Sequence, residues 1–393
     1  SAQTRGPDAL AAEIETRMTA VMPKVIAWRR DIHEHPELSN QETRTAALVE
    51  KHLRALGLEV RPNVGKTGVI GVLRGGKPGP VVALRADMDG LPITEANDLP
   101  FASKAKATYL GQPVGVMHAC GHDTHVAMLM GAAEVLSQVK KDLPGTVKFI
   151  FQPAEEGSLP GVEGGAKLMV KEGVLDKPKV DAVFGVHINA QTEVGRLTYR
   201  SGGEMASSDR FTIKVRGKGA HGAYPWNSVD PVVTAAQIIM GLQTIVSREV
   251  KLIDDAAVVT VGTINGGVRY NVIPPDVELS GTIRALNPEV QKQIWAAIRR
   301  IATGIAASAG ATADVAIEPA LTARMLPTLQ AAAGAANVRE IKAVTGAEDF
   351  SFYQEKVPGL FLFVGGMAPG TDPATTADHH TAGFRIDESG LTL

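Results

Sequence analysis

Five short apolar runs constrain the fold of this chain more than any other feature of its sequence. They are rich in β-branched residues and lie at residues 69–73, 81–85, 147–151, 182–187 and 360–364. Runs of this length with little polar alternation are typical of strands that are buried on both faces. Helical spacing of apolar residues at 124–139 and 165–171 falls between them. The alternation predicts an α/β domain in which helices cover a mixed sheet.

Two helices are expected to open this domain. Residues 8–33 show helical apolar spacing, and a second amphipathic stretch covers 42–56. Gly57 follows that stretch, and glycine is the usual residue just after the end of a helix.

The middle of the chain has a different order of elements. The sequence predicts a strand at 211–215, a helix at 231–245, strands at 258–264 and 277–283, a helix at 288–307 and a strand at 312–317. The order βαββαβ is that of a ferredoxin-like α+β domain. At 393 residues the chain is long enough for two domains. We therefore expect a first domain in two parts, 1–197 and 319–393, with a lid or dimerisation domain, 198–318, inserted between them.

Composition excludes several classes of function. The formal net charge of -2 gives no sign of a nucleic-acid partner, and 44% hydrophobic with 21% charged residues is ordinary for a soluble globular protein. The longest apolar runs are far shorter than the ~20 residues that cross a bilayer, so no membrane partner is expected. The opening SAQTRGPDAL has no methionine, which fits signal-peptide cleavage or an end introduced by cloning. Cytoplasmic, periplasmic and secreted localisation all remain open.

The densest chemical signal is MHACGHDTH, residues 117–125, where a predicted strand-to-helix junction carries three histidines and the single cysteine. Cys120 and His122 are separated by one glycine, so a turn there lets both side chains face one point. Thiolate and imidazole are ligands for zinc and related divalent metals. Two other interpretations stay open: a buried free cysteine beside structural histidines, and a thiol nucleophile with a histidine base.

A second signal is FQPAEEG, residues 151–157, where Glu155 and Glu156 follow a buried strand. Adjacent carboxylates are unfavourable there unless a cation neutralises one or one holds a proton. Metal-dependent hydrolysis uses one carboxylate as ligand and another as base. Surface loops also carry such pairs, so the motif alone is weak.

Further candidates follow other strands. His187 ends the apolar run AVFGVH, and Asp87 and Asp89 follow the run at 81–85. Taken alone, His187 fits a hydrogen-bonded core histidine better than a ligand. However, ligands of open α/β sheets gather at the carboxyl ends of strands. Candidates after several strands are thus expected to meet at one edge of the sheet.

Seven motifs together resemble a known family. They are MHACGHD, QPAEEG, VFGVHIN, GKGAHGAYP, NVIPPDVELSGTIR, GAEDFSFY and DHHTAGF, between residues 117 and 384. In this order they resemble the M20 metallopeptidases, and most closely the subgroup of N-acyl-amino-acid amidohydrolases, hippurate hydrolases and plant auxin-conjugate hydrolases. The resemblance runs from about Asp31 to Glu388. Two departures are a short connection between Ile317 and Leu321 and the absence of a final helix after FRIDESG.

The resemblance implies two divalent metal ions, such as Zn, Mn or Co, and a general base, Glu155. The implied metal ligands are Cys120, His122, Glu156, His187 and His380. His380 is preferred to His379 because the family has an aromatic residue four positions after its ligand, as Phe384 is here. By the same resemblance Asp87, Asp89 and Asp349 would orient ligands or lie near the substrate.

The resemblance also assigns three residues of the inserted domain. His221 would stabilise the oxyanion, often across a dimer interface, and Asn271 and Arg284 would bind a substrate carboxylate. Without the resemblance, His221 fits an exposed loop histidine and Arg284 a solvated strand end.

The activity implied is hydrolysis of the amide bond of N-acyl or N-aroyl amino acids by a homodimer or higher homo-oligomer. Two alternatives stay open: a carboxypeptidase or dipeptidase acting on short peptides, and a small-molecule binding protein without activity on the same fold.

Overall fold

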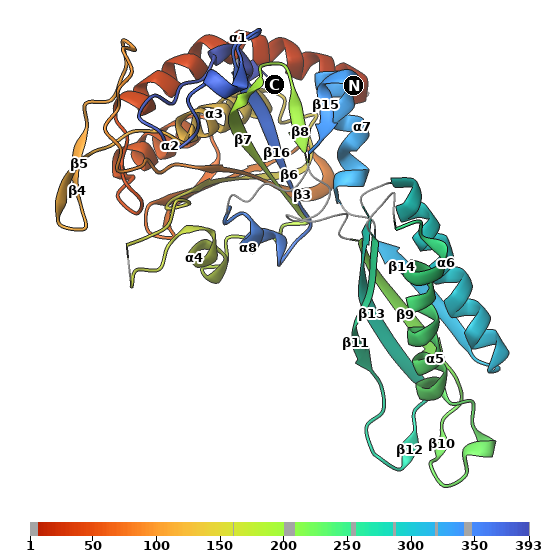
Figure 1. The fold of residues 1–393 in the computed structure, drawn as a ribbon. Coiled ribbons are helices and arrows are strands. Elements are labelled where there is room, and N and C mark those ends of the chain that lie inside the picture. Colours follow the sequence, from red (N-terminus) through yellow and green to blue (C-terminus); the bar gives the residue numbers. More distant parts are fainter. Residues whose placement is uncertain are drawn as a thin grey trace, which may run out of the picture. The chain divides into compact units, whose positions relative to one another are not determined.

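The computed structural model describes residues 7–159, 161–199, 209–252, 257–285, 288–318, 321–341 and 348–392. The chain forms two compact units, which Figure 1 draws and which are described separately below. Unit 1 comprises residues 1–199, 327–341 and 345–393, and unit 2 comprises 200–326 and 342–344. The predicted domain boundaries were 197/198 and 318/319. Residues 200–208 and 319–320, which adjoin them, lie outside the described residues.

Unit 1 is built on an eight-stranded mixed sheet. The strands in spatial order are β1 (Glu59–Val64), β2 (Gly68–Arg74), β6 (Pro144–Gln152), β3 (Lys77–Asp87), β7 (Ala182–Glu193), β16 (Gly359–Met367), β8 (Leu197–Tyr199) and β15 (Val338–Glu340). The central strands β6, β3, β7 and β16 are parallel, and β1, β2 and β8 add antiparallel pairs. All five predicted buried strands are therefore confirmed, whereas β1, β8 and β15 were missed.

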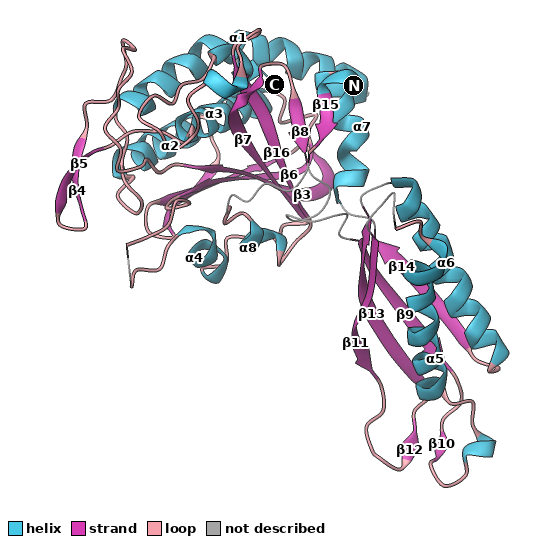
Figure 2. Ribbon diagram, in the orientation of Figure 1, coloured by secondary structure: helices cyan, strands magenta, loops and turns pink. Residues whose placement is uncertain are grey.

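Helices cover both faces of this sheet, as Figure 2 shows. The helices of unit 1 are α1 (Pro7–Glu34), α2 (Thr43–Ala55), α3 (His122–Gln138), α4 (Gly165–Lys171) and α8 (Ser351–Gln354), and α7 (Leu321–Ala333) runs into it from unit 2. One apolar core joins α2 and α3 to the sheet and contains Leu53, Val126 and Phe149. The core on the opposite face joins α4 and α8 through Met169 and Tyr353. A two-stranded hairpin, β4 (Lys106–Tyr109) and β5 (Gln112–Gly115), completes the unit.

Strand register brings the predicted site residues to one edge of the sheet. Asp87 at the end of β3 pairs with Gln152 at the end of β6. Arg85 pairs with Gly185 of β7, so His187 lies two residues further along and level with Asp87. The expectation that His187 ends its strand is wrong, because β7 stays paired with β16 through Asn189 and continues to Glu193. His187 is nevertheless beyond the last β3–β7 pair, where the strands diverge.

Unit 2 has the predicted ferredoxin-like order. Its sheet runs β11 (Ala257–Asn265), β13 (Asp276–Ala285), β9 (Asp209–Arg216), β14 (Thr312–Glu318), with all pairs antiparallel. The helices α5 (Pro231–Thr244) and α6 (Pro288–Ser308) share one apolar core with this sheet. Asp230 caps α5 by accepting the backbone N–H of Val232 at 2.8 Å, and Pro231 follows as the first helical residue.

A short pair of strands, β10 (Ala220–His221) and β12 (Val272–Ile273), lies at the Asp276 end of β13. None of the helices in the described ranges is both long and apolar enough to cross a membrane.

Candidate metal centre

The turn before α3 places Cys120 and His122 side by side. Gly121 between them has a left-handed backbone with φ +92, which suits glycine. A Cβ at this position would lie 2.3 Å from the side chain of Ile188, so a larger residue would also clash. This close approach brings the turn against β7, the strand that carries His187.

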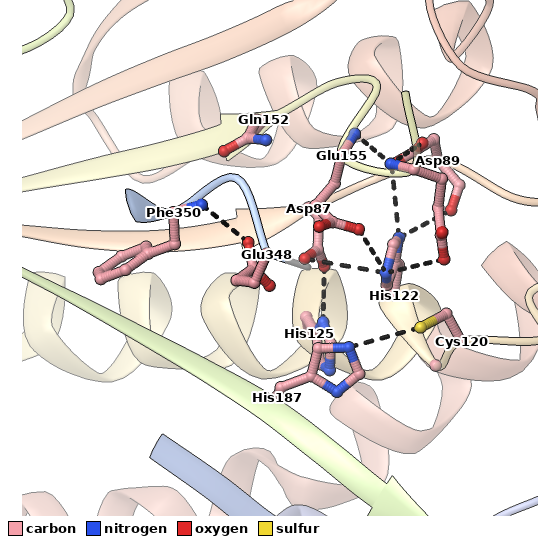
Figure 3. A network of polar contacts seen from close by, with 12 residues as sticks. Asp87, Asp89, Cys120, His122, His125, Gln152, Glu155, His187, Glu348 and Phe350 are labelled. Atoms are coloured by element: carbon pink, nitrogen blue, oxygen red, sulfur yellow. Dashed lines mark hydrogen bonds and ion pairs between the residues drawn. The ribbon is translucent and has the colours of Figure 1, made fainter. Parts of the chain in front are cut away.

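Four predicted ligands form a chain of short contacts. Cys120 Sγ lies 3.5 Å from His187 Nε2 and 3.3 Å from His380 Nε2. His380 Nε2 lies 3.0 Å from Glu156 Oε1. The fifth predicted ligand, His122, points its Nε2 into the same space, 3.9 Å from Glu156 Oε1. The structure thus brings all five predicted ligands together, and Figure 3 shows three of them, Cys120, His122 and His187.

His122 Nε2 is buried at the centre and has no hydrogen-bond partner among the described residues. Asp87 Oδ2 and Glu155 Oε2 each lie 3.8 Å from His122 Nε2. An unsatisfied buried polar atom costs free energy, so its position among the other candidate ligands suggests a group that binds them all. Ligand atoms around an ion with bonds of ~2.0–2.3 Å are about 3–4 Å apart, which matches this spacing.

Hydrogen bonds to the backbone fix the tautomers of two histidines. His122 Nδ1 lies 2.9 Å from the carbonyl oxygen of Asp89, and His187 Nδ1 lies 2.6 Å from the carbonyl oxygen of Ile188. A carbonyl only accepts, so each Nδ1 carries the proton and donates it. In the neutral form of each ring, Nε2 then presents a lone pair to the centre, which is the form of imidazole that binds metals.

The two neighbouring histidines of DHHTAGF have different surroundings. His379 Nε2 accepts the backbone N–H of Ala190 at 3.1 Å, and its Nδ1 lies 3.2 Å from the carbonyl oxygen of Cys120. Both of its nitrogens are therefore engaged by the backbone, whereas His380 Nε2 faces Cys120 Sγ and Glu156. This geometry favours His380 as the ligand.

Asp87 is held on two sides. His125 Nε2 accepts the backbone N–H of Ile188 at 2.8 Å, so its Nδ1 carries a proton and donates to Asp87 Oδ1 at 2.6 Å. The buried guanidinium of Arg85 donates to Asp87 Oδ2 at 2.7 Å. Arg85 and the two neighbouring histidines, His122 and His125, hold the pKa of Asp87 well below its usual value against the effect of burial. Asp87 is therefore an anion beside the proposed ligands.

Two buried carboxylates hold the loop that carries Glu155 and Glu156. Asp89 Oδ1 accepts the backbone N–H of Glu155 at 3.0 Å, and Asp89 Oδ2 accepts that of Glu156 at 3.1 Å. Glu42 Oε1 accepts the N–H of Ala154 at 2.9 Å. Three consecutive amides are thus fixed, although Ala154 has a left-handed φ of +52, which is uncommon for a residue with a side chain. The direction of both glutamate side chains depends on this clamp.

Without a bound cation, burial favours the uncharged form of two central side chains. Burial, and then the Glu348 carboxylate, raise the pKa of Glu155 to about 9. Burial raises the pKa of the Cys120 thiol to about 12. Neither group is therefore ionised at neutral pH without a nearby cation, and a bound divalent ion would favour the charged form of both.

Among the described residues, no hydrogen bond or ion pair joins Asp349 to any of the five predicted ligands. Its Oδ1 accepts from Arg85 at 3.1 Å and from Gln152 Nε2 at 2.7 Å, and its Oδ2 accepts the N–H of Ala166 at 2.7 Å. Asp349 therefore connects Arg85 to the first turn of α4.

The three predicted residues of unit 2 divide between its two ends. His221 is exposed, and the backbone N–H of Gly222 donates to the carbonyl of Asn271 at 2.9 Å. Arg284 is near the other end of β13, and the strand from Asp276 to Arg284 spans about 27 Å at ~3.4 Å per residue. His221 and Asn271 are thus neighbours, and Arg284 is distant from both.

Comparison with known proteins decides the family. The model of peptidase family M20/M25/M40 matches residues 83–388. The chain belongs to this family. It is 41% identical over 379 residues to an N-acetylcysteine deacetylase of Bacillus subtilis, covering 94% of this chain and 93% of that protein. It is 40% identical over 395 residues to thermostable carboxypeptidase 2 of Saccharolobus solfataricus, covering 98% and 96%.

A solved M20 structure is also similar. It is a Bacillus subtilis protein described as a dinuclear metal-binding peptidase, with a TM-score of 0.57 and 38% identity over 95% of each chain.

Sequence reasoning missed four residues of this M20 centre: Glu42, Arg85, His125 and Glu348. His125 carried a signal, because it is three positions after His122 and so on the same face of α3. Glu348 precedes the predicted Asp349 and its Oε1 accepts from Arg85 at 2.9 Å. Nothing in the sequence distinguished Glu42 from an exposed residue before a helix or Arg85 from the polar end of a strand.

Proposed function

We propose that this M20 protein is a metal-dependent amidohydrolase that cleaves N-acyl or N-aroyl amino acids, with Glu155 as general base. The observation that carries the proposal is the convergence of the buried, unsatisfied His122 Nε2 with the Glu156 carboxylate, the Cys120 thiol and the imidazoles of His187 and His380. A set of sulfur, nitrogen and carboxylate donors suits Zn, Mn or Co.

The arrangement supports two ions rather than one. Cys120 belongs to two overlapping groups of candidate ligands, one with His122 and His187 and one with Glu156 and His380. Its thiolate would be available to the ligands of either group. When bound, such ions polarise the acyl carbonyl and lower the pKa of a nearby water.

Glu155 is placed to move protons. Its Oε2 lies 3.8 Å from His122 Nε2, and its backbone is fixed by Asp89. We assign it to take the proton from the attacking water and deliver it to the leaving amine. Glu348 and Asp87 lie close enough to its carboxylate to favour return of the proton.

His221 has the hydrogen-bonding state that an oxyanion requires. Its Nδ1 accepts the backbone N–H of Ala223 at 3.1 Å, so the neutral ring carries its proton on Nε2 and can donate from there. Asn271 beside it and Arg284 are proposed to bind the carboxylate of the amino acid.

We further propose that the enzyme is a homodimer in which His221 and Asn271 serve the centre of the partner chain. Because about 27 Å of β13 separates the two ends of unit 2, Arg284 and His221 cannot both reach one small substrate from the same unit. The edge strand β11 exposes Val258 and Ile264, as edges that pair with a second chain do. A second copy covering this edge would hide both.

A thiol hydrolase is not supported, because burial keeps the Cys120 thiol protonated unless a cation is present. A carboxypeptidase or dipeptidase is the second candidate, favoured by the similarity to thermostable carboxypeptidase 2. It would use the same centre with an aminoacyl group in the acyl position.

The test is a substrate panel assayed with Zn, Mn or Co: N-acetyl, N-benzoyl and indole-acetyl amino acids beside dipeptides. Hydrolysis that a chelator abolishes and added metal restores supports the proposal. Turnover that survives complete removal of metal would refute it, and faster cleavage of dipeptides than of every N-acyl amino acid would favour the peptidase.

A further inference from the structure

A cavity of about 680 Å³ opens beside Glu155, on the face of the unit 1 sheet that carries α4 and α8. We name it the α4–α8 groove. The loop after Glu155 and the helix α4 supply one side of its lining, and α8 with the residues around it supplies the other. Glu155 and Asp349 are both among the lining residues, so the groove begins at the proposed general base.

The lining combines an apolar surface with charged groups. Val162, Leu168 and Phe352 provide the apolar part. Lys167 Nζ lies 6.0 Å from the centre of the Phe352 ring, a cation–π distance. Two other charged lining residues, Lys171 and Glu163, pair with each other at 2.8 Å. A flat apolar group therefore finds an aromatic surface at Phe352, between charged side chains that include Glu355 and Lys356.

The groove is tied to the metal centre by a rigid connection. Asp349 accepts hydrogen bonds from Arg85 and from the backbone of Ala166 in α4. Gly165, with φ +65, lets the start of α4 approach closely, since a Cβ there would lie 2.4 Å from Asp349 Oδ2. Arg85 also holds Asp87. The groove is therefore positioned by the same buried network that orders the centre.

We propose that the α4–α8 groove binds the acyl group of the substrate and selects aromatic or other bulky apolar acyl groups over acetyl. This inference rests on the proposed function, in which the amino-acid carboxylate is bound by residues of unit 2. Unit 1 then binds the acyl substituent of the substrate. The acyl carbonyl is attacked beside Glu155. Pockets of roughly 300–1,000 Å³ hold ligands of drug size, so this cavity is larger than an acetyl group needs.

The first test fills the groove with Val162→Trp, since Val162 is 42% exposed and a larger side chain there does not disturb the core. The readout is the ratio of kcat/KM for the N-benzoyl derivative to that for the N-acetyl derivative of one amino acid. A single methylene group in a specificity pocket changes such ratios by about 10- to 200-fold. We expect the ratio to fall at least about tenfold, mostly through KM for the benzoyl substrate.

Leu110→Trp is the matched control, because Leu110 is 62% exposed at the turn between β4 and β5 and does not line the groove. We expect it to leave the ratio unchanged. An equal effect of both tryptophans, or no effect of Val162→Trp, would overturn the proposal.

A second variant removes the aromatic surface instead. Phe352→Ala should lower the same ratio, and Phe352→Leu should lower it less, with metal content and melting temperature recorded for each. A wild-type preference for acetyl over benzoyl would overturn the groove assignment while leaving the proposed function intact. A wild-type enzyme that hydrolyses neither substrate would instead refute the proposed function.

Discussion

The metal centre of unit 1 and the β10–β12 end of unit 2 are built in opposite ways. At the centre, Cys120 and His122 are buried and Glu156 and His187 half-buried, and the unsatisfied His122 Nε2 lies 3.9 Å from Glu156 Oε1. At the β10–β12 end, large apolar side chains face outward: Trp226 is 74% exposed and Tyr270 is 94% exposed. In the proposed function, one chain supplies all five metal ligands, whereas its oxyanion donor, His221, serves another chain.

The largest expected effect separates chemistry from metal binding within the centre. Glu155→Gln keeps the shape of the side chain but cannot accept a proton, so kcat should fall about a hundred- to ten-thousandfold while both ions stay bound. Metal analysis and steady-state kinetics measure the two quantities. Loss of both ions in this variant would contradict the assignment of Glu155. Glu156→Gln is the matched comparison and should lose metal instead.

The next effect tests the β10–β12 end of unit 2. His221→Ala should lower kcat by roughly a hundred- to thousandfold with little change in KM or metal content, because an oxyanion donor acts only in the transition state. Mixing His221→Ala with Glu155→Gln chains should restore part of the activity, since each mixed dimer has one site with both groups intact. No recovery despite measured subunit exchange would show that His221 acts within its own chain.

A third effect concerns how the centre holds its ions. Serine does not ionise near neutral pH as a metal-bound thiol does, so Cys120→Ser should weaken metal affinity by about a hundredfold or more and make activity depend on added metal. Dialysis followed by metal analysis checks this. Normal metal content and activity after dialysis would return Cys120 to the class of buried cysteines without function.

The smallest effect tests the clamp on the catalytic loop. Glu42→Ala removes the acceptor for the backbone N–H groups of Asn40 and Ala154, so we expect kcat to fall about tenfold and stability to drop by about 1–3 kcal/mol. Glu42→Gln is the control, because an amide oxygen still accepts both N–H groups and its NH₂ can donate to the hydroxyl of Thr67. Equal losses in both variants would show that the charge of Glu42 matters rather than its geometry.

The local pattern of apolar residues was sufficient to predict the main helices and strands of both units. Uninterrupted apolar runs identified the buried strands of unit 1, because strands covered on both faces carry few polar residues. The short strands β8 and β15 were missed, since three residues carry no periodicity. The hairpin β4–β5 was missed because only four residues form each of its strands.

The candidate ligands could be predicted from their motifs, but the residues that hold them in place could not. Arg85 interrupts an apolar run, and the sequence does not show that its partners are Asp87, Glu348 and Asp349. Glu42 is 112 positions from the amide it holds at Ala154. A hydrogen bond over such a separation depends on how the chain packs. A single sequence does not show which distant groups come into contact.

Because unit 2 is inserted into unit 1, the proposed ligands are synthesised in two separate stages. His187 precedes the inserted unit in the chain, and His380 follows it. A chain that emerges from its N-terminus must therefore complete the inserted unit before the last ligand exists. In the proposed function, bound ions would therefore stabilise the full-length chain more than a chain that ends before His380.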